Sequence, residues 1–434
     1  MAKKIVVIGA GFAGMMSALA AQRLIRKTQQ EREPTEDIEV TVIAPDEKLV
    51  LRPRLYEENS GSMSAPLGDL FKVTGIRFVQ GSVETIDVET QQVASVDAAG
   101  TRSTHPYDRL VLAAGSDVVL PSDVPGLSQH SFAVDHLHSA IRLEGHLKRL
   151  PSVPATTSGR NTLVICGGGY TGLEVAAELP GRLANIPGLS KDNMRVIVIE
   201  RADIIGPDLS ASVRPFILQT MERLGVEVKL GNAVTSIDAG GITTSAGEHI
   251  GTLTPIWTAG TVAAPLTQQV PGVKDQFGRL VVDTDLRCPE SKAIFAAGDT
   301  ACARTDESDD DDAVSSPTQH QYSKMSCQHA LPMGRYAGHN AAADLMGLPT
   351  LRYSQVMLGT VLDLGQGGAI FAAGCGDEND VVALSGVEAK PLKRWINETL
   401  IYPPRADDIA RALEAGNPLV GVFDLMQQKD SIIC

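Results

Sequence analysis

The chain has 434 residues, of which 43% are hydrophobic and 21% charged, and this composition is typical of a globular protein. At about 150 residues per domain, the length predicts roughly three domains. The chain carries 38 lysines and arginines against 52 aspartates and glutamates, a formal net charge of −14. This balance excludes nucleic acid as a partner, because phosphate binding needs clustered basic side chains. It also argues against a charge-held contact with an anionic membrane.

The cysteines and the chain start indicate the cellular compartment. Six cysteines are scattered without a Cys-x-x-Cys pair, and nine histidines show no metal-ligand spacing, so we expect neither a redox dithiol nor a bound metal. Such sparse cysteine use suits a reducing compartment. No stretch approaches the ~20 apolar residues of a spanning helix, and the start shows no signal peptide. We therefore expect a cytoplasmic protein with no integral membrane segment.

Two segments of the chain repeat one pattern: a β-branched strand, a glycine-rich turn, a helical stretch and a second β-branched strand. The four parts span residues 5–8, 9–14, 15–24 and 38–43 in the first copy, and residues 162–166, 167–172, 173–179 and 195–200 in the second. This is the first half of a dinucleotide-binding βαβ unit. One such turn is a weak signal, but two copies in the same context predict two bound dinucleotides.

The chemistry of the turn explains its residues. The first glycine allows the tight turn, the second leaves room for a pyrophosphate, and the third lets helix and strand pack closely. The helix N-terminus then offers free N–H groups to the phosphates. The second unit ends in Glu200, which favours NADH because a carboxylate repels the 2′-phosphate of NADPH, while the neighbouring Arg201 leaves NADPH open. In the first unit, Asp46 is the candidate ribose ligand.

The remaining chain contains shorter signals. Runs at 109–113 and 293–296 are each followed by a glycine and predict sheet strands, and the runs at 78–80, 92–95 and 241–245 predict small antiparallel meanders. We expect a linker at 151–160 and a solvated, mobile loop at 306–312, where six of seven residues are acidic. From about residue 350 the pattern changes to strands and turns, with a terminal helix near 407–415.

These motifs resemble those of the two-dinucleotide-binding flavoprotein superfamily, and within it the type II NADH dehydrogenase and AIF-like branch, over residues 1–345. The turn at 9–14 is similar to the superfamily's FAD turn, the run 257–260 to its crossover, and the run 294–299 to its second FAD motif. The resemblance implies an α/β fold with two interleaved Rossmann-like domains, for FAD and NAD(P)H, and a small C-terminal α+β domain. The implied boundaries are 1–155 and 262–345 for the FAD domain, 156–261 for the NAD(P)H domain and 346–434 for the C-terminal domain.

The resemblance implies FAD and NADH as cofactors, with NADPH open, and assigns residues to them. The residues expected to bind the cofactors are Gly9, Gly11, Phe12, Ala13, Gly14, Asp46, Arg52, Pro53, Ala114, Gly115, Gly167, Gly169, Tyr170, Thr171, Gly172, Glu200, Gly260, Gly298, Asp299 and Gln328. The residues expected at the reacting centre are Arg52, Glu174, Cys327 and Gln328.

Two of these assignments leave alternatives open. Arg52 and Arg54 flank Pro53, and this pair either orients an anionic acceptor and the reduced flavin or forms a salt bridge with Glu57 or Glu58. Tyr170 either shields the flavin or packs on the turn.

Two further side chains near the expected flavin carry alternatives of their own. Cys327 is either a reactive thiol, as in sulfide-oxidising relatives, or a small buried hydrophobe, which is the commoner case. His329 either relays protons or lies on a helix surface. Glu178, like Glu174, follows the second turn, and we interpret it as a first-helix acid favoured by the dipole.

The predicted function is an FAD-dependent NAD(P)H oxidoreductase that passes a hydride from NADH to flavin and then electrons to a small-molecule acceptor. Quinone leads by resemblance, although the superfamily's quinone-facing Gln-Gln pair falls on Pro332-Met333 here. The alternatives are a biosynthetic or detoxifying flavoenzyme, a sulfide- or thiol-oxidising enzyme that uses Cys327, and an AIF-like NADH-sensing protein with little turnover. Residues 388–434 show no membrane-lying helix, so we expect no peripheral membrane contact, and a homodimer stays open.

Overall fold

The structure is a computed structural model that describes residues 2–31, 37–189, 193–305, 322–355, 359–374 and 380–420. Its largest sheet has six strands in the order β20-β21-β9-β1-β2-β5, all parallel except for the β20–β21 pair. The strands are β1 (Lys3–Ile8), β2 (Ile38–Ala44), β5 (Arg77–Gln80), β9 (Arg109–Leu112), β20 (Arg287–Cys288) and β21 (Ser291–Ala296). The central strands are continuous apolar runs because helices and loops cover both faces of the sheet.

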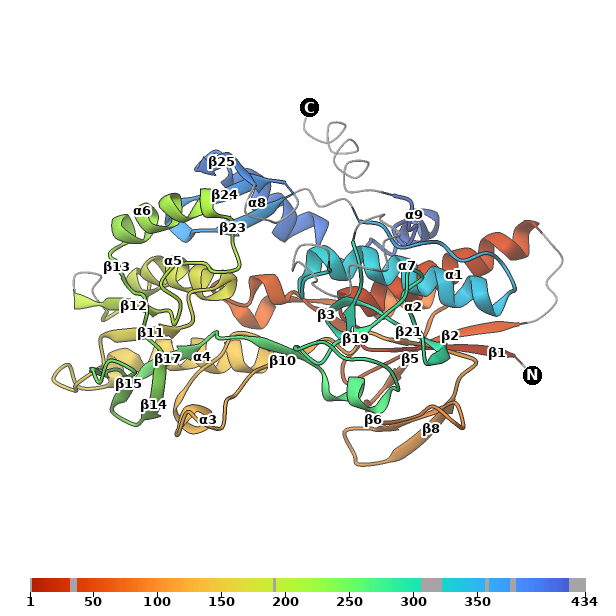
Figure 1. The fold of residues 1–434 in the computed structure, drawn as a ribbon, viewed down its shortest axis with the longest axis horizontal. Coiled ribbons are helices and arrows are strands. Elements are labelled where there is room, and N and C mark those ends of the chain that lie inside the picture. The colour runs from red at the N-terminus through yellow and green to blue at the C-terminus, as the bar shows by residue number, and fades with distance from the viewer. Residues whose placement is uncertain are drawn as a thin grey trace.

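A second parallel sheet, in the order β13-β12-β11-β17, lies beside the first (Figure 1). Its strands are β11 (Thr162–Cys166), β12 (Arg195–Ile199), β13 (Val226–Lys229) and β17 (Thr254–Trp257). These strands fall in sequence between β9 and β21, so the second sheet is inserted into the first. The chain crosses between the sheets as an antiparallel ribbon of β10 (Ser116–Val118) and β18 (Thr261–Ala263), which the Trp257 indole braces by donating to the Val119 carbonyl at 2.8 Å. The fold is therefore α/β with interleaved units, while the predicted domain boundaries stay predictions.

Several smaller sheets accompany the two parallel sheets. The strands are β3 (Lys48–Val50) and β4 (Ser64–Pro66); β6 (Ser82–Asp87), β7 (Gln92–Val96) and β8 (Arg102–Pro106); β14 (Val234–Asp238), β15 (Gly241–Thr244) and β16 (His249–Gly251); and the short parallel pair β19 (Leu280–Val281) and β22 (Ala301–Cys302). The meanders predicted at 92–95 and 241–245 are confirmed. The one predicted at 78–80 is wrong, because β5 pairs parallel with β2. Helix α2 (Gly68–Thr74) supplies the crossover that parallel pairing requires, and a three-residue run carries no sign of it.

Helices α1 (Phe12–Glu31) and α7 (Cys327–Leu345) cross over the first sheet at very short range. A Cβ on Gly334 would lie 2.3 Å from the Ala13 carbonyl oxygen, and one on Gly338 would lie 2.0 Å from the Ser17 carbonyl oxygen. The other helices are α3 (Leu127–His130), α4 (Leu137–Arg149), α5 (Tyr170–Ala184), α6 (Arg214–Leu224), α8 (Lys390–Trp395) and α9 (Ile409–Glu414). The close crossing fixes where α7 begins, which is the end that faces the site described below.

The C-terminal part of the chain divides between the two sheets (Figure 1). Strands β23 (Thr360–Asp363), β24 (Ala369–Ala373) and β25 (Val381–Gly386) form a sheet whose apolar side chains join the core around the second parallel sheet. Helix α9, in contrast, lies against α1, and Ala412 joins the core of the first sheet. The terminal helix predicted near 407–415 is confirmed, with the Asp408 side chain accepting from the Arg411 backbone N–H at its start.

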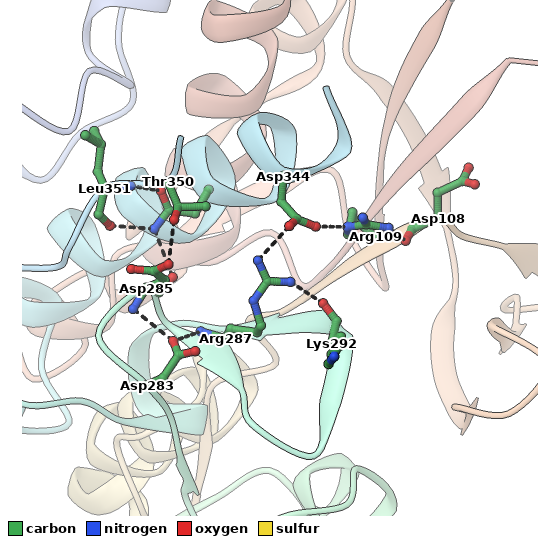
Figure 2. A network of polar contacts seen from close by, with 10 residues as sticks. Asp108, Arg109, Asp283, Asp285, Arg287, Lys292, Asp344, Thr350 and Leu351 are labelled. Carbon is green, nitrogen blue, oxygen red and sulfur yellow. Dashed lines mark hydrogen bonds and ion pairs between the residues drawn. The ribbon is translucent and has the colours of Figure 1, made fainter. Parts of the chain in front are cut away.

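A polar network fixes the far end of α7 (Figure 2). The Asp344 carboxylate accepts from Arg109 on β9 and, at 2.8 Å, from Arg287 on β20, so that one acid joins a helix to two strands. Nearby, Asp283 accepts from the backbone N–H of Arg287 at 2.9 Å. This network lies at the opposite end of α7 from Cys327, so the helix is anchored away from the site.

Three further observations concern sequence expectations. Residues 151–160 form turns between α4 and β11, where we expected a linker, and the acidic run 306–312 lies outside the described residues. Among the helices of the described ranges, none is both long and apolar enough to cross a membrane. The same ranges contain no group of three or more His, Cys, Asp or Glu side chains that could hold a metal ion.

Candidate active site

One large cavity, of about 3180 Å³, runs between the two parallel sheets and under the C-terminal strands. A pocket for one small ligand is typically about 300–1,000 Å³, so this volume admits two dinucleotides and a further molecule. Both glycine turns, the crossover ribbon, the start of α7 and the C-terminal residues 392–401 contribute to its wall. The cavity therefore connects the two predicted nucleotide sites.

The first turn has the shape that a bound pyrophosphate needs. Gly9 has φ +106° and its Cβ would lie 2.3 Å from the Ala113 carbonyl oxygen, while a Cβ on Gly14 would lie 2.0 Å from the Gly9 carbonyl oxygen. Gly11, in contrast, faces open space within the cavity. The turn thus keeps its middle glycine clear at the N-terminus of α1, where backbone N–H groups attract phosphate.

The second turn repeats this geometry at the N-terminus of α5. A Cβ on Gly172 would lie 1.9 Å from the Gly167 carbonyl oxygen, and near Gly169 a Cβ would meet only the Asp208 carboxylate, at 3.7 Å. Glu200 follows β12 and accepts from the backbone N–H groups of Gly168 at 2.7 Å and Ala202 at 2.8 Å. Each carboxylate oxygen has a second lone pair, so Glu200 can still accept from ribose hydroxyls.

The segment expected beside the flavin contributes Arg52 to a polar cluster with Ser116 and Asp299. The Arg52 guanidinium lies 3.5 Å from the Asp299 carboxylate, and Ser116 donates to the same carboxylate at 2.7 Å. Arg54 instead pairs with Glu57 at 2.6 Å and donates to the Tyr402 hydroxyl at 2.9 Å. The salt-bridge alternative thus describes Arg54, whereas Arg52 faces the cavity.

The structure brings nearly all predicted site residues to this one cavity. Those that line it are Gly9, Gly11, Phe12, Ala13, Asp46, Arg52, Pro53, Ala114, Gly115, Gly167, Gly169, Tyr170, Thr171, Glu174, Glu200, Gly260, Gly298, Asp299, Cys327 and Gln328. Gly14 and Gly172 lie behind the turns, where they allow helix and strand to pack. Asp46 is exposed and forms an ion pair with Lys48 at 3.3 Å.

A buried ion pair closes the cavity beside the second turn. The Lys393 ammonium of α8 lies 2.9 Å from the Glu174 carboxylate of α5, and each residue is only 4% exposed. Glu174 also accepts from the Asp363 backbone N–H at 3.1 Å. Burial raises the pKa of Glu174 to about 6, with Lys393 opposing the rise. Tyr170 donates its hydroxyl to the Val361 carbonyl of β23, so a hydrogen bond to the C-terminal sheet holds its side chain.

The start of α7 carries Cys327 and His329. Burial raises the pKa of the Cys327 thiol to about 11, so it holds its proton at neutral pH. His329 is buried rather than on a helix surface, which corrects that expectation. Its ring lies 2.9 Å from the Ser326 hydroxyl at the helix cap, and burial lowers its pKa to about 3. A histidine that cannot take up a proton near neutral pH is a poor relay.

Comparison with known proteins identifies the family. The pyridine nucleotide-disulphide oxidoreductase family matches residues 3–334. The chain belongs to this family. It is 39% identical over 421 residues to an NADH dehydrogenase-like protein of Mycobacterium tuberculosis, covering 96% of this chain and 98% of that protein. It is also 28% identical over 405 residues to the demethylphylloquinone reductase of Synechocystis sp., with 91% of each chain covered.

Solved structures share the fold. NDH2 from Plasmodium falciparum in complex with NADH superposes with a TM-score of 0.74 at 13% identity, covering 99% of this chain and 98% of that one. The sulfide:quinone oxidoreductase of Aquifex aeolicus gives 0.73 at 17% identity, with 98% and 95% covered. The family member described here is an NAD(P)H-dependent flavoprotein oxidoreductase with FAD and NAD(H) as cofactors.

Among the residues of the cavity wall that sequence reasoning missed are Tyr56, Lys393 and Asn397. Lys393 stands between Lys390 and Arg394 in the sequence, and nothing there distinguishes the buried lysine from its exposed or half-buried neighbours. Its role depends on α8 packing against α5, about 220 residues earlier in the chain.

Proposed function

We propose that the chain passes the reducing equivalents of NADH to a quinone that binds in the C-terminal part of the cavity. The observation that carries this proposal is the buried Glu174–Lys393 pair, which lies in the wall of the C-terminal part of the cavity together with several apolar side chains. The apolar residues of that part of the cavity wall include Pro332, Leu392, Ile396, Leu400 and Ile401. A flat, apolar ring with one or two carbonyl oxygens fits walls of this kind.

Lys393 is suited to a carbonyl oxygen. An ammonium has three N–H donors. One points to Glu174 at 2.9 Å and a second to the Val361 carbonyl at 3.3 Å, which leaves a third for a ligand in the cavity. After Lys393 has donated a proton to the quinone oxygen, Glu174, with its pKa raised by burial to about 6, can return a proton to the neutral amine.

The overall reaction balances as NADH, one proton and a quinone giving NAD⁺ and a quinol. Bound FAD supplies the uptake of a hydride from NADH and the release of two electrons to the quinone. The chain orients both molecules, excludes water and delivers the proton to the quinone oxygen. The names of the relatives from Synechocystis and from Staphylococcus aureus, a type II NADH:quinone oxidoreductase that is 24% identical, support the same class of acceptor.

Two observations bear on the choice of electron acceptor. At the position of the superfamily's Gln-Gln pair, Pro332 lines the cavity and Met333 is buried in the core, so other groups must hold the quinone. The raised pKa of Cys327 disfavours the sulfide- or thiol-oxidising alternative, because the thiolate is the nucleophile.

The test is anaerobic reduction of the purified protein by NADH, followed by mixing with menadione or with ferricyanide. We expect menadione to reoxidise the protein rapidly. Replacing Lys393 with Met should slow that step at least tenfold, because the quinone oxygen loses its proton donor, with reduction by NADH retained. Lys390→Met is the matched control, since Lys390 lies on the same helix but pairs with Asp363 outside the cavity wall.

The result that contradicts the proposal is a wild-type protein that NADH reduces and ferricyanide reoxidises but that menadione leaves reduced. An unchanged menadione rate in Lys393→Met would instead remove the lysine from the mechanism.

A further inference from the structure

One arginine on the cavity wall is buried without an acidic partner among the described residues. Arg335 lies on α7, is only 7% exposed and lines the cavity. Its Nη1 donates to the Val420 carbonyl at 3.0 Å, and its Nε has no partner. Burial lowers the pKa of its guanidinium, and no acid of the described ranges opposes this effect. Buried charges are almost always paired with an opposite charge, which makes Arg335 a candidate for binding an anion.

The other buried arginines of the described ranges have their charge or their N–H groups satisfied. They are Arg160, Arg182 and Arg279. Arg279 forms an ion pair with Asp275 at 2.7 Å, and three acids raise the pKa of Arg182 against the effect of burial. Arg160 donates to three oxygen atoms. Arg335, with one hydrogen bond to a backbone carbonyl, differs from all three.

The Nη2 group is the part of Arg335 that a ligand can reach. The Nε atom is enclosed by protein, so no ligand in the cavity contacts it. Nη2, in contrast, forms no hydrogen bond with a described residue and is not among the enclosed polar atoms, so it faces the cavity that Arg335 lines. Its two N–H groups can donate to the oxygen atoms of a carboxylate or phosphate group.

Arg335 shares one face of α7 with Gln328, Leu331 and Pro332. These residues stand three, four or seven positions apart, which is the spacing of one helix face, and all of them line the cavity. The Gln328 amide donates to the Gly359 carbonyl at 3.2 Å. This face of α7 therefore turns to the C-terminal part of the chain, where the quinone is proposed to bind.

The FAD pyrophosphate is not the anion that suits Arg335. It is expected at the turn of residues 9–14, where α1 begins. The side of α7 that meets this turn carries Gly334, whose Cβ would lie 2.3 Å from the Ala13 carbonyl oxygen. Arg335 follows Gly334 and is therefore turned about 100° away around the helix.

The same face of α7 connects Arg335 with the proposed site of the quinone ring. Burial raises the pKa of the Cys327 thiol and the Lys393 ammonium opposes the rise, so these two side chains lie within electrostatic range of each other. Cys327 and Arg335 are eight residues apart, which is about 12 Å along a helix. Between them the wall carries the apolar side chains of Leu331 and Pro332. A ligand that contacts both ends has a ring, about 10 Å of apolar chain and an anionic group.

We propose that the acceptor is a quinone with an acidic side chain, whose carboxylate or phosphate group binds Arg335 while a ring oxygen binds Lys393. This inference deepens the proposed function and rests on it. The anionic group takes no part in the transfer of electrons, and its contact with Arg335 positions the ring. A quinone with a purely hydrocarbon side chain would offer the buried guanidinium no counter-ion.

The experiment compares two synthetic 1,4-naphthoquinones with the same side chain of about eight carbons, which ends either in a carboxylate or in its methyl ester. Steady-state KM and kcat are measured near neutral pH, with NADH saturating, in the wild type, Arg335→Gln and Arg335→Lys. In the wild type, KM for the acid should be about tenfold lower than KM for the ester, because only the acid forms a charged hydrogen bond. Arg335→Gln should bring the two KM values within twofold of each other, and Arg335→Lys should keep most of the difference.

Two controls separate this contact from a general loss of structure. Arg394→Gln is the matched variant, because Arg394 is exposed on α8 and does not line the cavity, and it should keep the wild-type preference for the acid. Menadione has no side chain that could contact Arg335. Its KM should therefore be the same in the wild type and in Arg335→Gln.

The inference is overturned if the wild type reduces menadione but its KM values for the acid and the ester differ by less than twofold. It is also overturned if Arg335→Gln keeps the preference for the acid. If the acid has no advantage and added phosphate raises the Tm of the wild type but not of Arg335→Gln, then Arg335 binds a free anion and the acceptor is neutral. A wild type that ferricyanide reoxidises but that no quinone reoxidises contradicts the proposed function instead, so the two failures are distinguishable.

Discussion

At the scale of single residues, the protein keeps a carboxylate and an ammonium together although each residue is only 4% exposed. Removing two charges from water is costly, and their mutual attraction often only offsets that cost. The Glu174–Lys393 pair therefore adds little stability by itself, and its place on the cavity wall favours a role in chemistry. The pKa of Glu174, about 6, lies close enough to neutrality for proton exchange.

Replacing Glu174 with Gln tests this residue through the pH dependence of the quinone step. In the wild type, proton delivery needs the protonated acid, so the rate of reoxidation by menadione should fall as the pH rises through about 6. The variant should be slower at pH 5.5 and should lack the inflection, as stopped-flow measurements between pH 5 and 8 would show.

Glu178→Gln is the control for that pH profile. Glu178 lies one turn further along α5, has a pKa that burial raises to about 7, and does not line the cavity. If the inflection disappears in Glu178→Gln but persists in Glu174→Gln, then Glu178 carries the proton and our scheme names the wrong residue.

At the scale of elements, the crossing of α1 and α7 sets the position of everything that α7 carries. The two backbones touch because glycines of α7 face carbonyl groups of α1. Any side chain at the crossing separates the helices, and α7 then shifts the cavity wall at Cys327 and Gln328. Interiors packed at crystal-like density transmit such a shift rather than absorb it.

Gly338→Ala should lower the free energy of unfolding by about 2 kcal/mol, because the added methyl overpacks the crossing. The check is the urea midpoint together with the amount of flavin retained on purification. Gly145→Ala in α4 is the control, since its Cβ would meet only the mobile end of Arg149, at 3.3 Å. That variant should gain about 0.5–1 kcal/mol from helix propensity. Equal midpoints for both variants would contradict the close crossing.

At the scale of the whole molecule, α7 spans the first sheet from the cavity to the network around Asp344 (Figure 2). Burial raises the pKa of Asp344, but hydrogen bonds from Arg287 and Arg109 outweigh it and leave the pKa below its ordinary value. An acid with a lowered pKa contributes stability above its unfolded pKa of about 4, and this contribution is lost as the pH falls through the folded value.

Asp344→Asn should therefore lower the free energy of unfolding by about 2 kcal/mol at pH 7, because two guanidinium groups lose a charged acceptor. The difference in Tm from the wild type should shrink between pH 5 and about pH 3, because protons bind first to the unfolded chain, near pH 4, and to native Asp344 only at lower pH. Asp407→Asn, in an exposed pair with Arg405, is the control and should change Tm by less than a degree or two at either pH. A pH-independent difference would remove the ionised pair from the explanation.

The motifs in the sequence predict the two nucleotide turns and the parallel strands that flank them, and the family resemblance implies that both units belong to one interleaved fold. The turns could be predicted because the strand, glycine turn and helix are local, and because Gly14 and Gly172 are required by crowding against Gly9 and Gly167 of the same turns. Nearly all residues predicted from those motifs line one cavity. The strand at 78–80 and the burial of His329 were misjudged, because both depend on neighbours distant in sequence.

Which side chains meet beyond the turns depends on how distant segments of the chain pack together. Lys393 and Asn397 reach the cavity because α8 and the π-helical turn at Ile396–Leu400 pack against α5 and the segment around Tyr56, which come from three separate parts of the chain. Burial then changes the chemistry of these side chains, since it raises the pKa of Glu174 and of Cys327. Desolvation depends on the packing of the whole interior, so no local sequence pattern predicts these pKa shifts.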